Sequence, residues 1–276
     1  MNALYAKKYG NSIKWTIVEP STVEPVKGCY AEYIRKIWDC SFSDTKLQSE
    51  TGCLVHSHVI EHLFDLESFM EQNEQMLANG QKMIFSVPNL KETLKRKYTN
   101  ALNFEHTYYI SEDYVDACLR RHAFSVIEKK YFKADHSIFY VTEKKEQAEN
   151  VTDIDFSHLY TENKKIFMEY VKYYEELIRD LNDRMAKEER PVYLFGAHIF
   201  SQYLIYFGLN TANIRYILDN DKRKQGKRLY GTSLSVRSPE ILAGEKRPVV
   251  ILRAANYTDE IKTGILEHMN AETVFW

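Results

Sequence analysis

Cys53–Asn89, which read CLVHSHVIEHLFDLESFMEQNEQMLANGQKMIFSVPN, decide the fold of this chain. A short apolar run at Cys53–Ser57 predicts a strand and is followed by a polar turn. Asp65 predicts a helix N-cap, because apolar residues recur behind it at helical spacing. An Asn-Gly pair then ends the helix, and Lys82–Val87 predicts a second strand that the following proline stops. The pattern therefore predicts a strand–helix–strand unit.

A unit of this length favours a right-handed parallel crossover. Its polar turn then falls at the carboxyl end of the first strand, the edge where open α/β sheets bind ligands. The polar residues of this turn are His56, Ser57, His58, Glu61 and His62. The order of strand, H-V-I-E-H-L, helix, N-G, strand and V-P-N resembles the fourth and fifth strands of a class I S-adenosylmethionine-dependent methyltransferase.

Composition limits the classes of function. The chain has 276 residues, with 37 Lys and Arg against 39 Asp and Glu, so we expect no broad attraction to nucleic acid or to an anionic membrane. Its four cysteines show no CxxC spacing, which argues against a zinc knuckle or a disulfide framework. With no membrane-length apolar run and no signal peptide, we expect a reduced, cytoplasmic setting.

An acidic residue ends an earlier predicted strand, Lys14–Val18. In nucleotide-binding α/β folds a carboxylate at this place accepts hydrogen bonds from ribose hydroxyls. Glu19 suits that role, although the pattern is equally typical of an acidic residue that ends a strand and binds nothing. The methyltransferase resemblance adds Pro20 and Ser21 to the cofactor site, and Tyr33–Trp38 is the predicted third strand.

The methyltransferase fold places a first strand and a glycine-rich turn before this point, where the backbone approaches the cofactor. We find neither upstream of Lys14. We therefore expect either a longer gene product or an impaired cofactor site.

The remainder of the first half predicts the closing elements of the same sheet. Ser111 is the predicted cap of a helix that runs through Arg121, and two strands follow at Phe124–Phe132 and Ser137–Thr142. The resemblance implies that they form the antiparallel hairpin that ends a class I methyltransferase sheet. The inward positions expected on the helix are Tyr114, Val115, Cys118 and Leu119.

Three parts are expected: a methyltransferase domain over residues 1–147, a linker and connecting helix over 148–190, and a smaller Rossmann-like α/β domain over 191–276. A helix is predicted over Ser157–Arg190, with Ile166, Tyr170, Tyr173, Leu177 and Leu181 inward. The last part has predicted strands at Val192–Phe195, Ile214–Leu218 and Pro248–Leu252 and a helix at Ile199–Phe207. One glycine after its first strand is a weak dinucleotide signal, because the full fingerprint needs three.

The two halves together resemble the sugar C-methyltransferases, which methylate a carbon of a nucleotide-linked keto sugar. The motifs that carry the resemblance are Gly196-Ala197, Asp219-Asn220, Lys224-Gln225-Gly226, Tyr230-Gly231-Thr232 and Pro239-Glu240-Ile241. The catalytic segment of that family reads Tyr-His-Glu-His-Leu-Ser-Tyr-Phe-Ser, and this chain matches its Glu, His, second Tyr and final Ser within Glu105–Ser111. Asn103 and Phe104 replace its leading Tyr-His, and its cysteine-rich zinc domain is absent.

The resemblance assigns a role to each candidate residue. C-methylation beside a ketone needs a base, and a histidine suits that task near neutral pH. His106 is the expected base, Glu105 its orienting partner and Tyr109 a donor to the enolate oxygen. The expected contacts of S-adenosylmethionine are Glu19, Pro20, Ser21, His56, Ser57 and His58. The expected substrate contacts are Glu61, His62, Asn89, Gly196 and His198. Without the family match, Glu105 and His106 would be interpreted as capping the helix that follows.

Four alternatives stay open. His58–His62 spells H-x-x-E-H, the inverted zinc peptidase motif, but it directly follows a strand and lacks an identified third ligand, so we expect no metal here. The chain could instead be a catalytically impaired enzyme, a non-enzymatic module that binds the cofactor or a nucleotide sugar, or a sugar O-methyltransferase. The sequence leaves the sugar and the oligomeric state open. The geometric prediction is that Glu19, His58–His62 and Glu105–His106 line one crevice along one rim of a parallel sheet.

Overall fold

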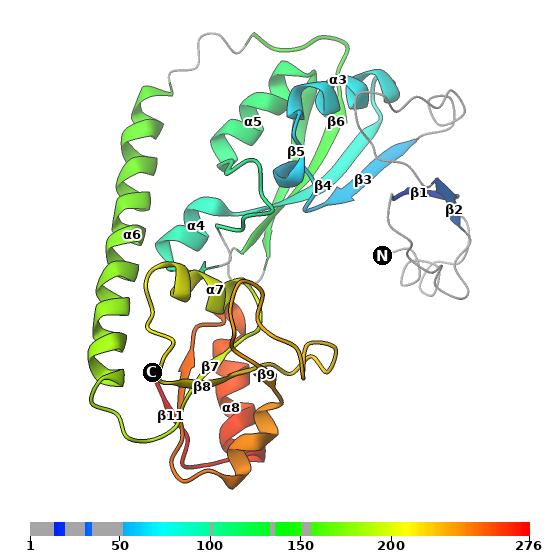
Figure 1. The fold of residues 1–276 in the computed structure, drawn as a ribbon. Helices are drawn as coiled ribbons and strands as arrows, with labels where there is room; N and C mark the ends of the chain where they lie inside the picture. The colour runs from blue at the N-terminus through cyan, green and yellow to red at the C-terminus, as the bar shows by residue number, and fades with distance from the viewer. Residues whose placement is uncertain (1–13, 20–30, 35–51, 100–101, 133–135, 151–155) are drawn as a thin grey trace.

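A computed structural model describes residues 14–19, 31–34, 52–99, 102–132, 136–150 and 156–276 (Figure 1). Pro20, Ser21 and residues 35–38 of the predicted third strand lie outside these ranges. No described helix combines the length and the apolar character that crossing a membrane requires.

The first large sheet has four strands in the order β3-β4-β6-β5. They are β3 (Cys53–Ser57), β4 (Lys82–Pro88), β5 (Phe124–Phe132) and β6 (Ser137–Lys144). β3 and β4 are parallel, whereas β6 is antiparallel to both β4 and β5. This arrangement confirms the parallel strand–helix–strand unit and the closing hairpin.

Two helices cover this sheet. The helix α3 (Leu66–Met76) connects β3 to β4, and the carboxylate of Asp65 accepts the N–H of Ser68 at 3.0 Å, as expected of an N-cap. The helix α5 (Glu112–Arg121) starts after Ser111, but the hydroxyl of Ser111 makes no cap bond. Tyr114 was predicted to face inward and is instead 38% exposed. The buried face of α5 rests on Val115 and Leu119, which pack in one cluster with α3 and β4.

The first two strands form a separate sheet in the described residues. β1 (Trp15–Val18) and β2 (Ala31–Ile34) pair in parallel over their full four-residue lengths. The edge of β3 is not paired with either of them. The methyltransferase resemblance led us to expect these strands in the sheet of β3, but among the described residues they pair only with each other.

The second large sheet is entirely parallel, with the order β11-β10-β7-β8-β9. Its strands are β7 (Val192–Phe195), β8 (Ile214–Leu218), β9 (Val236–Arg237), β10 (Val249–Leu252) and β11 (Val274–Phe275). Counted along the chain this is the order 3-2-1-4-5 of a Rossmann-type sheet, whose switch point lies between its first and fourth strands. The helices are α7 (Ile199–Tyr206), α8 (Thr258–His268) and short 3-10 turns at Pro239–Gly244 and Ala255–Tyr257.

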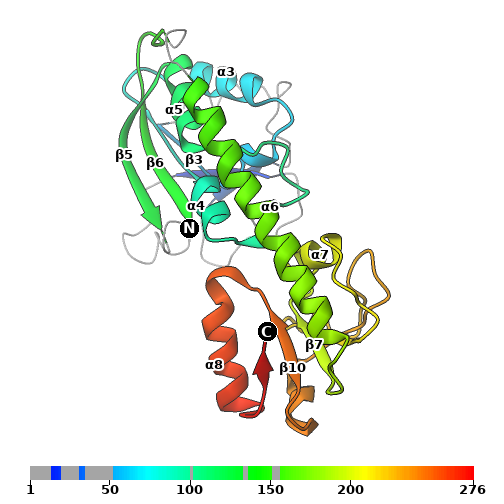
Figure 2. The ribbon, with the colours of Figure 1, turned by 90° about the vertical axis from the view of Figure 1, so that its left-hand side faces the viewer.

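The long helix α6 (Ser157–Met185) lies alongside both large sheets, as Figures 1 and 2 show. Its buried face belongs to one apolar cluster that runs from Leu94 of α4 (Leu90–Lys95) to the strands of the second sheet. The buried residues of α6 are Leu159, Ile166, Tyr170, Tyr174, Ile178, Leu181 and Met185. Tyr173 was predicted inward but is 37% exposed, and its neighbour Tyr174 takes the core position.

Candidate functional site

The turn after β3 is a 3-10 turn, Ile60–His62, held by His58. His58 has a positive φ of 52°, a strained conformation for a side-chain-bearing residue. Its Nδ1 lies 3.1 Å from Oε1 of Glu61, and its Nε2 lies 3.2 Å from the hydroxyl of Ser137. Both ring nitrogens are therefore occupied. The zinc peptidase interpretation requires both histidines of the motif on one helix, whereas His58 precedes the 3-10 turn and lies outside any helix.

The loop that carries the expected base docks onto this turn. The backbone N–H groups of Thr107 and Tyr108 both donate to the carbonyl of Glu61, at 2.8 and 3.2 Å. The Thr107 hydroxyl donates to the carbonyls of Glu61 and Leu63, and the Tyr108 hydroxyl donates to the carbonyl of Phe64. The structure thus brings together two of the three predicted segments, residues 58–62 and 105–106.

Glu61, His62 and His106 form the centre of this site. Each offers one ligand-type atom, and these atoms all lie within 4.8 Å of one another. The rings of His62 and His106 meet edge to face with centroids 4.8 Å apart. Nδ1 of His62 is hydrogen-bonded to the carbonyl of Glu105 at 3.0 Å.

The electrostatics of the site follow from burial and from these neighbours. Burial lowers the pKa of His106, and the nearby His62 and His58 act in the same direction against the opposing charge of Glu61. The carboxyl of Glu61 is 2% exposed. Burial would raise its pKa, but the hydrogen bond from His58 and the nearby histidines outweigh that effect, so the pKa is lowered. The group is held as a carboxylate whose Oε2 has no hydrogen-bond partner.

The other expected catalytic residues flank His106. Glu105 is exposed, and its N–H donates to the side-chain oxygen of Asn103 at 3.2 Å. The hydroxyl of Tyr109 donates to the carbonyl of Asn103 at 2.7 Å, and burial raises its pKa. In this conformation the hydroxyl proton of Tyr109 is used within the loop and is not directed at a space where a substrate oxygen could bind.

The expected cofactor residues do not form one group in the described structure. Glu19 directly follows β1, which belongs to the separate two-stranded sheet. Ser57 is exposed at the end of β3, where its hydroxyl shares a hydrogen bond of 2.7 Å with that of Ser86. His56 packs into the core between Phe85, stacked at 5.0 Å, and Phe69, edge to face at 5.5 Å.

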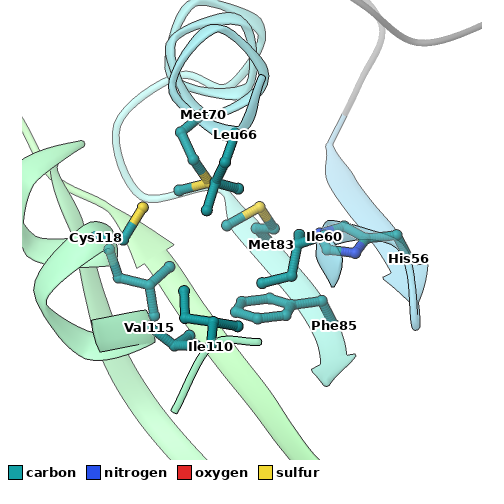
Figure 3. A pocket seen from close by; sticks show the side chains of 10 residues that line it. His56, Ile60, Leu66, Met70, Met83, Phe85, Ile110, Val115 and Cys118 are labelled. Atoms are coloured by element: carbon teal, nitrogen blue, oxygen red, sulfur yellow. The ribbon is translucent and has the colours of Figure 1, made fainter. Parts of the chain in front are cut away.

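His56 lines a small apolar cavity, shown in Figure 3, between β4, α3 and α5. The cavity volume of about 10 Å³ has room for one water molecule at most. Burial lowers the pKa of His56 to about 4, and neither ring nitrogen has a hydrogen-bond partner. This cavity is a packing feature, not a space for a cofactor.

A larger cavity of about 300 Å³ lies between the loop that carries His106 and the part of the chain that forms the second sheet, which we call the second unit. Asn103, Phe104 and Glu105 line it from one side. The opposite side consists of residues of the second unit: Ala197, His198, Gln202, Arg223, Lys224, Lys227, Arg228, Leu229, Tyr230 and Val236. Four of these are cationic at neutral pH, so the cavity favours an anionic ligand.

Two of the four cations are already paired. Nζ of Lys224 lies 3.1 Å from a carboxylate oxygen of Asp219, and Arg223 pairs with Asp221 at 2.9 Å. The side chains of Lys227 and Arg228 have no carboxylate partner among the described residues. Their charge is therefore available to a ligand.

The remaining expected substrate residues divide into two groups. His198 lines the large cavity, and burial lowers its pKa, with Lys224 acting in the same direction. Gly196 ends β7 with a φ of +102°, which a residue with a side chain rarely adopts, and its N–H donates to the carbonyl of Leu218. Asn89 instead caps α4, accepting the N–H of Glu92 at 3.3 Å.

The sequence prediction missed the cations of the cavity and its two exposed aromatic residues, Phe104 and Tyr230. A signal for the cations was present. The stretch Lys222–Arg228, KRKQGKR, has five basic residues around one glycine, after a strand of the Rossmann-like unit. Such a run at the carboxyl edge of a parallel sheet is a place for phosphate groups.

Comparison with known proteins relates the chain to C-methyltransferases. Residues 131–275 match a family model described as the C-methyltransferase C-terminal domain. The C-methyltransferase NovU from Streptomyces niveus is 25% identical over 211 residues, which cover 72% of this chain and 50% of NovU. The chain thus spans about half the length of that relative. The family match begins at Tyr131, near the end of β5, so it includes β6, α6 and the second sheet.

Solved structures show weaker likenesses. The 1,6-didemethyltoxoflavin-N1-methyltransferase of Burkholderia thailandensis, solved with S-adenosylhomocysteine, is 11% identical, with a TM-score of 0.37, over 52% of this chain and 66% of that chain. A Haloferax volcanii methyltransferase in complex with the Trm112 activator is 8% identical, with a TM-score of 0.42, over 54% and 78% of the two chains.

Proposed function

Because this chain belongs to the C-methyltransferase C-terminal domain family, we propose that it transfers a methyl group from S-adenosylmethionine to a carbon atom of a nucleotide-linked keto sugar. The family membership supports methyl transfer to carbon. The sugar, its nucleotide and the roles of individual residues are our proposal. The observation that carries it is the position of the loop Asn103–Tyr109, which contacts the Glu61 turn on one side and the cationic cavity on the other.

The base in this proposal is His106. A carbon beside a ketone loses a proton to a base, and the resulting enolate attacks the methyl group. The ring of His106 lies beside a buried carboxylate, that of Glu61, which stabilises the imidazolium after the proton arrives. Thr107 and Tyr108 fix the loop to Glu61, so the ring and the carboxylate keep their separation.

The large cavity is the proposed place of the nucleotide part of the substrate. Lys227 and Arg228, which have no carboxylate partner among the described residues, provide charge for a diphosphate. Phe104 and Tyr230 are 70% and 83% exposed, and such rings can stack on a nucleobase. Because Glu105 lines the cavity and His106 follows it, a sugar attached to the diphosphate can reach the base.

The described residues supply part of the fit for S-adenosylmethionine, which provides an electrophilic methyl group on a cationic sulfonium. The four-cation cavity is unsuited to that charge. The negative charge of Glu61 and the exposed hydroxyl of Ser57 suit it better; Ser57 is the last residue of β3, and Glu61 lies in the turn after it. Of the six expected cofactor contacts, Pro20 and Ser21 lie outside the described residues.

The test is a binding and product experiment on the full chain. S-adenosylmethionine and S-adenosylhomocysteine are titrated by calorimetry, and methyl transfer is then followed with labelled donor and nucleoside-diphosphate-linked keto sugars. We expect binding of the donor and a product with a new C–CH3 group that His106→Asn abolishes. An O–CH3 product would replace the proposal with sugar O-methylation. Nucleotide binding without any donor binding or transfer would replace it with a non-enzymatic module.

A further inference from the structure

Glu61, His62 and His106 have the composition and spacing of a metal-binding set. Their ligand-type atoms all lie within 4.8 Å of one another, although the residues come from two separate segments. Two imidazoles and a carboxylate are a ligand set found in catalytic zinc sites, which leave a further position open. The set is not that of the H-x-x-E-H motif, because Glu61 takes the place of His58 as a ligand and His106 comes from the loop after Asn103.

The carboxylate of Glu61 gives an independent reason to place a cation here. Its side chain is 2% exposed, and His58 occupies Oε1 at 3.1 Å. Oε2 is buried and has no hydrogen-bond partner. A buried carboxylate oxygen left without a partner is costly, and a cation bound to it removes that cost.

The imidazole of His62 is already oriented as a ligand. Its Nδ1 lies 3.0 Å from the carbonyl oxygen of Glu105, and a carbonyl can only accept, so Nδ1 carries the proton. Nε2 therefore has the free lone pair. Metal-bound histidines commonly donate their second N–H to a backbone carbonyl in this way, which fixes the tautomer.

We propose that Glu61, His62 and His106 bind a divalent transition metal ion, with zinc as the reference metal. Zinc bonds such atoms at about 2 Å, so small side-chain rotations from the present separations complete the site. The arrangement differs from a peptidase, because His58 supports Glu61 from behind and is not a ligand. One consequence rests on the proposed function: an ion on His106 takes the lone pair that the base needs, so zinc inhibits methyl transfer.

The test measures zinc binding alone and does not depend on activity. The purified full chain is stripped with EDTA, dialysed and titrated with Zn²⁺ against a chromogenic zinc indicator. We expect one strongly bound zinc per chain, with affinity at least tenfold weaker in His62→Ala and in His106→Ala. His268→Ala is the matched control, because His268 is exposed on α8, and it is expected to bind zinc like the parent.

Circular dichroism and thermal melting show whether each variant is folded. The side chain of His62 has one hydrogen bond among the described residues, to the carbonyl of Glu105, so His62→Ala tests the site without removing the buried Glu61. Co²⁺ substitution gives a second measurement: visible absorption bands of a four-coordinate ion are expected in the parent and absent in His62→Ala. The proposal is overturned if the parent binds no zinc, or if folded His62→Ala and His106→Ala bind it as His268→Ala does.

Discussion

The backbone N–H of Thr107 donates a 2.8 Å hydrogen bond to the carbonyl oxygen of Glu61. The hydroxyl of Thr107 reaches the same oxygen at 3.2 Å and also donates to the carbonyl of Leu63. One residue therefore joins the loop of the proposed base to the turn after β3. Because these two segments are far apart in the sequence, the geometry of the site depends on this contact.

Replacing Thr107 with valine keeps the shape and the backbone bond but removes the hydroxyl. We expect the free energy of unfolding to fall by about 1 kcal/mol, since one net hydrogen bond contributes about that much. Urea denaturation measures it. The control is Thr263→Val on the exposed face of α8, expected to change stability by less than about 0.5 kcal/mol. Equal values for the two variants would show that the hydroxyl of Thr107 contributes nothing.

His56 predicts a pH dependence of stability. Burial lowers its pKa in the folded protein to about 4, below the ordinary value of 6.5. Between these values the unfolded chain binds a proton that the folded chain does not. Stability is therefore full above pH 6.5 and is lost as the pH falls towards 4, by at most about 3 kcal/mol.

The variant His56→Phe isolates this contribution, because phenylalanine fits the stack with Phe85 but does not titrate. Unfolding is measured in urea at several pH values from 7 to 4.5. We expect the parent to lose more stability than the variant across this range, whereas the control His268→Phe follows the parent. Parallel pH profiles of the parent and His56→Phe would contradict the assignment.

The periodic parts of the fold were predictable, and the parts set by long-range contact were not. The unit β3–α3–β4 has a strong local pattern with a cap and a glycine turn, and it is confirmed. Strands β9 and β11 have two residues each, too few for any pattern to show. On α6 the adjacent Tyr173 and Tyr174 are equally apolar, so only the packed structure decides which is inward.

The same distinction applies to the site. The resemblance pointed to Glu61 and His106 separately, but local pattern does not reveal that Thr107 and Tyr108 dock onto the Glu61 carbonyl. In the sequence, His56 belongs to a strand that leads into a polar turn, so it was interpreted as a binding residue. Only its packing against the aromatic rings from α3 and β4 shows that its side chain belongs to the core. The cationic cavity likewise depends on two distant units meeting.

Lys227 predicts the ligand class of that cavity. It lines the cavity and has no carboxylate partner among the described residues, so its charge contributes to binding an anion. We expect Lys227→Ala to weaken the binding of a nucleoside diphosphate at least about tenfold, because a hydrogen bond to a charged group contributes about 1.5–3 kcal/mol. The probes are UDP and TDP. Calorimetric titration measures this.

Lys222→Ala is the control for this prediction. Lys222 belongs to the same basic run and is exposed, but it does not line the cavity. Its removal lowers the net charge equally and is expected to change affinity less than twofold. If the two variants lost affinity to the same extent, the effect would come from overall charge and not from a built site.

Tyr174 couples α6 to the first unit. Its hydroxyl donates to the carbonyl of Lys97, just after α4, while its ring lies 1% exposed in the cluster that reaches the second sheet. Tyr174→Phe keeps the ring and leaves that carbonyl without this donor, so we expect a loss of about 1–2 kcal/mol in the free energy of unfolding. Tyr160→Phe, on the same helix but 66% exposed, is the control and is expected to be near neutral. Hydrogen exchange gives the sharper measurement. Faster exchange of the amides of α4 in Tyr174→Phe than in Tyr160→Phe would show that this hydrogen bond couples α6 to α4. Equal exchange in the two variants would contradict that coupling.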